Sequence, residues 1–85
     1  MKPLITVVIP TYNNAIQLVK NLEHNQRFME NCEVIVVNDN PRISFLHKLE
    51  SFKVQLINHS TNKGFAGAVN TGIQAAQGKY ILLLN

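Results

Sequence analysis

The 85-residue sequence has one cysteine, one aspartate and no tryptophan. It is therefore poor in the cysteine and aspartate residues that form disulfides, metal sites and paired carboxylates. The single cysteine, Cys32, excludes an internal disulfide and cannot form a zinc site alone. Because Asp39 is the one aspartate, the chain offers few carboxylates for acid–base hydrolysis, which needs a pair of them. No apolar run approaches the roughly 20 residues of a membrane span, and the apolar start is too short for a signal peptide. We therefore expect a cytoplasmic protein and leave membrane association of the intact protein open.

Charge of either sign is also sparse. Eight basic and five acidic side chains give a net charge of +3, and they are scattered along the chain. No basic stripe with interleaved aromatic side chains is present, so we expect no nucleic-acid partner. Hydrophobic residues make up 46% of the chain, which is enough for a packed core.

Short apolar runs alternate with amphipathic stretches along the whole chain. The apolar runs predict buried strands at residues 4–10, 33–37, 53–57 and 79–84. The amphipathic stretches predict three helices: from Asn13 or Asn14 to about Met29, from Pro41 to about Leu49, and from Phe65 to Ala76. This alternation predicts an α/β fold with a doubly wound, mostly parallel four-stranded sheet and three helices.

Glycines contribute to these expectations in different ways. Gly78 stands where a left-handed helix C-cap belongs, and Gly67 and Gly72 favour close packing of a helix against the sheet. For Gly64, close approach of a phosphate or sugar is as good an interpretation as packing. The turn after the first strand has no glycine, which excludes the dinucleotide-binding Gly-x-Gly-x-x-Gly pattern, and a phosphate-binding Gly-Lys-Ser/Thr is absent.

Polar side chains follow each predicted strand, and the carboxyl ends of parallel strands meet at one edge, where ligands bind. Asp39 can accept a hydrogen bond from a pyrimidine ring N–H or cap the helix expected near Pro41. Tyr12 can stack on a base or cover the core. His59 has no second histidine or cysteine close enough in the sequence to suggest a metal site, and His24 and His47 fall on expected helices, facing solvent.

Four segments carry a family resemblance in their order and spacing: residues 6–13 (TVVIPTYN), 33–40 (EVIVVNDN), 62–73 (NKGFAGAVNTGI) and 76–85 (AQGKYILLLN). Together they resemble the N-terminal part of the family 2 glycosyltransferases, which have the A-type fold and use nucleotide-sugar donors. The last two segments look most like rhamnosyltransferase-type relatives. The resemblance implies the strand order 3-2-1-4 and a nucleotide site made of Pro10, Thr11, Tyr12, Asp39, Lys63 and Gly64.

Within that site, the resemblance implies that Asp39 contacts the uracil or thymine ring of a UDP- or dTDP-sugar. Asn85 would be the first position of the family's Asp-x-Asp motif, written Asn-x-Asp, whose last Asp binds Mg²⁺ or Mn²⁺ and so neutralises the leaving diphosphate. Asn38 departs from the family's usual acid pair, and Pro41 stands near where a serine is common.

We therefore expect residues 1–85 to be the nucleotide-binding N-terminal portion of one inverting glycosyltransferase domain, truncated at the metal motif. The metal-binding Asp, the general base and the region for a glycan or lipid-linked acceptor would follow residue 85. No catalytic residue would lie within the chain, which alone would be inactive. The alternative is a stand-alone, non-catalytic α/β binding or assembly module, and the reading frame after codon 85 discriminates the two. In either case the apolar fourth strand would be an unprotected edge that favours self-association.

Overall fold

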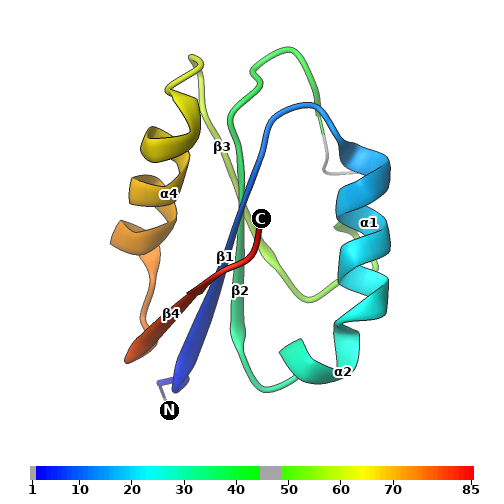
Figure 1. Cartoon of the computed structure of the whole chain (residues 1–85), viewed down its shortest axis with the longest axis vertical. Coiled ribbons are helices and arrows are strands. Elements are labelled where there is room, and N and C mark those ends of the chain that lie inside the picture. The colour runs from blue at the N-terminus through cyan, green and yellow to red at the C-terminus, as the bar shows by residue number, and fades with distance from the viewer. Residues whose placement is uncertain (1, 45–48) are drawn as a thin grey trace.

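The sheet that the sequence predicts is present and wholly parallel. A computed structural model describes residues 2–44 and 49–85 (Figure 1). Its four strands are β1 (Ile5–Thr11), β2 (Glu33–Asn38), β3 (Gln55–Asn58) and β4 (Tyr80–Leu83). They lie in the order β3-β2-β1-β4, and all three pairings are parallel. The predicted α/β class and strand order are confirmed, with strand ends displaced by one or two residues.

The two central strands form the core of the sheet because their side chains are buried on both faces. Val7 and Val8 of β1 and the run from Val34 to Val37 of β2 are all buried. Uninterrupted β-branched sequence suits a parallel strand covered by helices on both sides. These strands are the rigid elements whose carboxyl ends carry the candidate site.

One face of the sheet is covered by two consecutive helices, α1 (Ala15–His24) and α2 (Gln26–Met29) (Figure 1). The Asn14 side chain caps α1 by accepting a hydrogen bond from the Gln17 N–H. Leu18, Leu22 and Met29 pack against β1 and β2. The sequence predicts one continuous helix here, but Asn25 interrupts it: its backbone N–H and side-chain amide both donate to the Asn21 carbonyl.

The helix expected to begin at Pro41 does not begin there. The Asn40 side chain accepts from the Arg42 N–H, and the Asn38 side chain accepts from the Asn40 N–H, each across two residues. These local side-chain turns compete with helical hydrogen bonding, so residues 41–44 form a turn and an irregular segment. Leu46 and His47, expected on the same helix, lie outside the described residues.

The opposite face of the sheet is covered by α4 (Gly64–Ala75), close to the predicted helix from Phe65 to Ala76. The large apolar residues of α4 are not its buried ones, because Phe65 is 56% exposed and Ile73 is 45% exposed. Ala68 and Gly72 face the sheet instead. A Cβ on Gly72 would overlap Cγ1 of Val8, so the predicted close packing is confirmed for Gly72. A Cβ on Gly67 would meet the side chain of Lys63, not the sheet.

Gly78 is not a left-handed cap. Among the described residues the one positive φ belongs to Gly64, at +81°. Gly78 is required for a different reason, because a Cβ there would lie 2.6 Å from both the backbone nitrogen and Oγ1 of Thr6. The Gly78 N–H also donates to Thr6 Oγ1 at 2.9 Å. This contact brings the chain back to the sheet just before β4.

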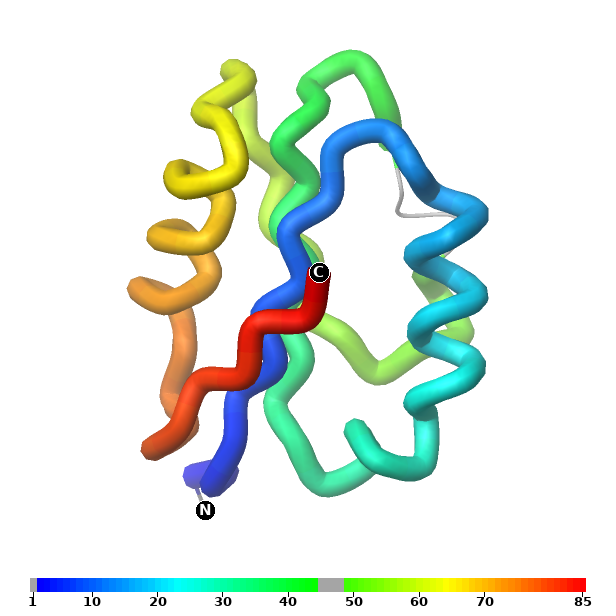
Figure 2. The backbone as a smooth tube through the Cα atoms, viewed as in Figure 1, coloured from blue at the N-terminus to red at the C-terminus, as the bar shows by residue number. Residues whose placement is uncertain are grey.

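Strand β4 lies at one edge of the sheet and pairs with β1 from Ile5↔Tyr80 to Val8↔Leu83 (Figure 2). All four of its side chains are exposed. An apolar edge strand with exposed side chains favours pairing with another chain. Self-association of this protein stays a prediction. No helix in the described part of the chain is long and apolar enough to cross a membrane.

Candidate functional site at the carboxyl edge of the sheet

A pocket of about 370 Å³ lies at the carboxyl edge of the sheet, where β1, β2 and β4 end and α4 begins. It brings together residues from four separate segments: Pro10, Thr11, Tyr12, Asp39, Asn62, Gly64, Phe65, Ala68 and Asn85. All but one of the residues implied by the family resemblance therefore line one pocket. The exception is Lys63, which reaches the site through its backbone.

Asp39 joins three parts of this edge. Its backbone N–H extends the β1–β2 ladder by donating to the Thr11 carbonyl at 2.8 Å. Its Oδ1 accepts from the Lys63 N–H at 2.8 Å, and its Oδ2 accepts from the Gly64 N–H at 2.9 Å. The alternative that Asp39 caps a helix near Pro41 is therefore wrong, because the carboxylate caps the beginning of α4. An acidic group is favourable at this end of a helix.

His59, which follows β3, completes the surroundings of the carboxylate. Its Nδ1 lies 2.7 Å from Asp39 Oδ1, and its Nε2 lies 2.8 Å from Thr71 Oγ1 on α4. Sequence reasoning missed this role and treated His59 as an isolated loop histidine. The strand register explains the contact: Asn38 pairs with Asn58, so the residues that follow them become neighbours.

Opposing effects act on the ionisation of Asp39. Burial raises the pKa of the carboxyl, since the side chain is only 4% exposed. The hydrogen bond from His59 and the N–H groups of Lys63 and Gly64 act against burial, and the net pKa lies below the usual aspartate value. Asp39 is therefore a carboxylate at neutral pH, and an ionised carboxylate only accepts hydrogen bonds.

The lowered pKa of Asp39 predicts a loss of stability in acid. The folded-state pKa lies below the unfolded value, so the ionised group stabilises the fold above about pH 4, the ordinary pKa of aspartate. That contribution disappears as the pH falls through the folded-state pKa. We expect urea midpoints of the wild type to fall in this acid range more steeply than those of Asp39→Asn. Parallel curves for the two proteins would contradict the prediction.

Gly64 begins α4 in a conformation that side-chain-bearing residues rarely adopt, and this frees its N–H to point at Asp39. Its φ is +81°, and a Cβ there would meet nothing within 4 Å. The Gly64 N–H is shared between Asp39 Oδ2 and Asn62 Oδ1, the latter at 3.0 Å. Glycine is needed here for its backbone conformation, while the exposed Lys63 supplies a backbone N–H to the same carboxylate.

Two aromatic rings line the pocket. Tyr12 is 50% exposed, so it does not serve as a cover for the core. Phe65 comes from the first turn of α4 and is also half-exposed. Flat, partly exposed rings at the edge of a pocket are suited to stacking on a planar ligand. Phe65 was not among the predicted site residues, because the sequence marked it only as the beginning of a helix.

Asn85 lines the same pocket and can supply one amide oxygen. The described residues contain no group of three or more His, Cys, Asp or Glu side chains that could hold a metal ion. One amide oxygen supplies too few ligands to hold Mg²⁺ or Mn²⁺. Asn85 thus lies beside the other residues of the pocket without forming a metal site in the described part of the chain.

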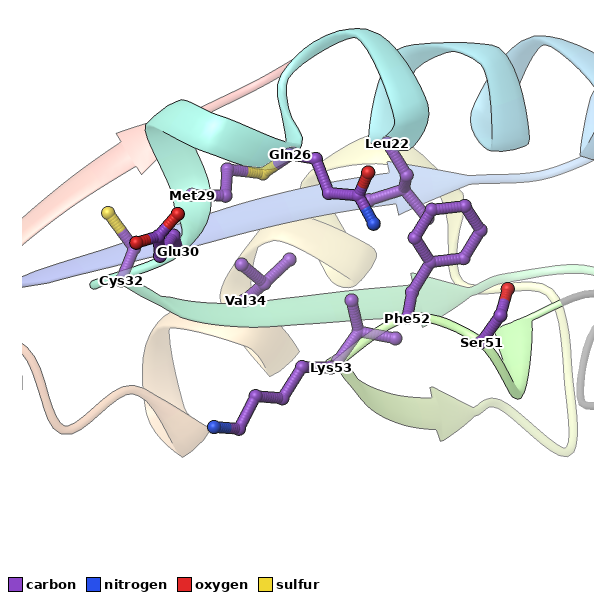
Figure 3. A pocket seen from close by; sticks show the side chains of 10 residues that line it. Leu22, Gln26, Met29, Glu30, Cys32, Val34, Ser51, Phe52 and Lys53 are labelled. Carbon is purple, nitrogen blue, oxygen red and sulfur yellow. The ribbon is translucent and has the colours of Figure 1, made fainter.

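A second hollow of about 400 Å³ lies at the opposite end of the sheet (Figure 3). Leu22, Met29, Val34 and Phe52 contribute to its largely apolar wall, with Gln26 beside them. It contains no histidine or aspartate and lies far from the ends of the strands where polar groups converge. We therefore place the candidate chemistry at the carboxyl edge, where polar groups from several strand ends meet.

Comparison with known proteins shows the family of the chain. Residues 6–85 match the family model for glycosyl transferase family 2. The chain belongs to this family. The resemblance drawn from the four sequence segments is confirmed, and the parallel sheet is consistent with a fragment of the A-type glycosyltransferase fold. The rhamnosyltransferase-type resemblance stays a prediction.

Named glycosyltransferases align along nearly the whole chain. It is 35% identical over 91 positions to glycosyltransferase GlyG of Streptococcus pneumoniae serotype 4, covering 100% of this chain and 30% of that protein. It is 27% identical to a dolichyl-phosphate beta-glucosyltransferase of Dictyostelium discoideum, covering 95% and 30%. It is 30% identical to the amylovoran biosynthesis glycosyltransferase AmsB of Erwinia amylovora, covering 94% and 29%. The chain thus spans about 30% of the length of these curated relatives.

Proposed function

We propose that residues 1–85 form the nucleotide-binding N-terminal portion of a glycosyltransferase that takes its sugar from a UDP- or dTDP-linked donor. The observation that carries this proposal is the pocket at the carboxyl edge, which unites Thr11, Tyr12, Asp39 and Asn85 from separate strand ends. Ligand binding at this edge is the rule for open parallel sheets.

The chemistry of the pocket favours a uracil or thymine base. Asp39 Oδ2 accepts one N–H, from Gly64, and a carboxylate oxygen can accept a second. The N3–H of uracil or thymine is a donor of the required kind, whereas N3 of cytosine carries no hydrogen. Tyr12 and Phe65 supply the flat surfaces on which such a ring stacks.

The complete reaction extends beyond these residues. In the intact enzyme a general base deprotonates an acceptor hydroxyl, which attacks the anomeric carbon as the nucleoside diphosphate leaves, with inversion. If Asn85 begins the family's metal motif, as the resemblance implies, a divalent cation held there would neutralise the charge of the diphosphate. The acceptor is a glycan or a lipid-linked group, as the dolichyl-phosphate in the name of the Dictyostelium relative suggests. The base and the cation ligands lie outside residues 1–85, so this chain alone binds nucleotide and transfers no sugar.

Calorimetric titration with UDP, dTDP and CDP tests the nucleotide site. We expect UDP or dTDP to bind at least about tenfold more tightly than CDP, because a buried acceptor left without a donor costs more than 1 kcal/mol. Tyr12→Ala should weaken UDP binding by about tenfold through lost stacking. Tyr80→Ala is the matched control, because Tyr80 is similarly exposed, at 57%, but lies on β4 outside the pocket.

Two results would contradict the proposal. Equal affinities for UDP and CDP would mean that the ring N–H is not recognised. Equal effects of Tyr12→Ala and Tyr80→Ala on UDP binding would mean that Tyr12 does not stack on the base and that the nucleotide binds elsewhere.

A further inference from the structure

We infer that His59 and Thr71 are positioning residues, which hold the Asp39 carboxylate so that one of its oxygens stays available to the nucleotide base. The inference rests on the proposed function for the identity of the ligand. Its geometric basis is the continuous line of contacts from Asp39 through His59 to Thr71. Neither His59 nor Thr71 lines the pocket, so both act through Asp39.

The two oxygens of Asp39 have different surroundings. Oδ1 accepts two hydrogen bonds, from His59 Nδ1 and from the Lys63 N–H, which use both of its acceptor positions. Oδ2 accepts one, from the Gly64 N–H, and keeps one position. His59 therefore fixes the rotation of the carboxyl group, and the free acceptor position belongs to the oxygen that Gly64 holds at the beginning of α4.

The contact between His59 and Asp39 can form in both charge states of the histidine. An ionised Asp39 can only accept, so His59 Nδ1 carries the hydrogen of this contact. Thr71 Oγ1 lies 3.0 Å from the Gly67 carbonyl as well as beside His59 Nε2. The hydroxyl can donate to a neutral Nε2, or accept from a protonated Nε2 while donating to Gly67. The same heavy-atom positions therefore serve both charge states of His59, and Nδ1–H faces Asp39 in each.

Few other charged groups surround this line of contacts. Tyr12 lines the pocket beside Asp39, and Arg42 lines a neighbouring hollow together with His59. Lys63 directs its backbone N–H to the carboxylate, and its side chain lies against Gly67. His59 is thus the titratable side chain in direct contact with Asp39 among the described residues.

A matched pair of variants tests the inference. Leucine and asparagine have nearly the same shape, but only the asparagine amide can replace the Nδ1–H donor. We expect His59→Leu to weaken UDP binding by about tenfold, the effect of losing one charge-assisted hydrogen bond. His59→Asn should restore most of the affinity. The pH midpoint at which UDP binding is lost in acid should move upward in His59→Leu and return in His59→Asn.

A readout without ligand separates this inference from the proposed function. Asp39 is the one aspartate of the chain, so its carboxyl ¹³C resonance is identified by composition. Its NMR titration midpoint should rise in His59→Leu and return in His59→Asn whether or not UDP binds. If His59→Leu does not fold, Thr71→Val with Thr71→Ser as control is expected to give a smaller shift in the same direction. Identical Asp39 midpoints in the wild type and the folded donor-lacking variants would overturn the inference, while a shifted midpoint without UDP binding would reject the proposed ligand alone.

Discussion

Asp39→Ala is expected to lower the free energy of unfolding by about 3 kcal/mol, because it leaves a buried histidine and two helix N–H groups without their acceptor. The side chain ties the end of β2 to the beginning of α4 and to the residue after β3. A domain of this size has roughly 3–5 kcal/mol in total, so the variant should be close to unfolded at room temperature. Urea denaturation followed by circular dichroism measures the change.

Two further variants separate the role of the carboxylate from the loss of any acidic residue. Asp39→Asn keeps the shape and one acceptor oxygen, and it should destabilise less than alanine. Glu23→Ala removes an exposed acid from α1 and should change stability by no more than about 0.5 kcal/mol. If Asp39→Ala unfolds at the same urea concentration as Glu23→Ala, the carboxylate does not join these elements.

Gly72→Ala is expected to lower the free energy of unfolding by about 1–3 kcal/mol through overpacking. The added Cβ would overlap Cγ1 of Val8, a fully buried residue of the central strand β1, and it also lies 3.2 Å from Val8 Cγ2. Neither the helix nor the strand can shift without disturbing its other contacts, because interiors are close-packed. Alanine would otherwise favour a helix, so a stabilised variant would contradict the packing described here.

A double mutant locates the clash. In Val8→Ala the two methyl groups that obstruct the new Cβ are absent, so Gly72→Ala should cost much less in that background. The difference between the two costs is the coupling energy of the pair. Gln74→Ala, at an exposed position of the same helix, is the control for helix propensity. Additive effects of Val8→Ala and Gly72→Ala would place the strain elsewhere.

The strands were predictable from the sequence because their signal is strong and local. Runs such as Val34 to Val37 suit a strand buried on both faces, and alternation with helices leaves few possible topologies. The face of α4 was predictable in part. The close packing of Gly72 was predicted, but the exposure of Phe65 and Ile73 was not. Small residues allow the closest approach of a helix to a sheet, so Ala68 and Gly72 are buried and the larger side chains are not.

The candidate site was predictable in part. The carboxyl edge collects the ends of all strands, so Thr11, Tyr12, Asp39 and Asn85 could be placed together before the structure was known. The contact between Asp39 and His59 depends on the β2–β3 register, which the sequence does not specify. The turn at Asn40 was not predictable, because asparagine before proline is typical of a helix N-cap as well as of a turn, and only the hydrogen-bond partners distinguish them.

The position of β1 between β2 and β4 has a consequence for synthesis on the ribosome. β1 is made first, yet its partner β4 begins at Tyr80, and a ribosome adding about 5–20 residues per second needs several seconds to reach it. During that interval one side of the nascent β1 has no native neighbour. Because Val7 and Val8 pair with Leu82 and Leu83 of β4, we expect the nascent chain to recruit chaperones until β4 leaves the exit tunnel.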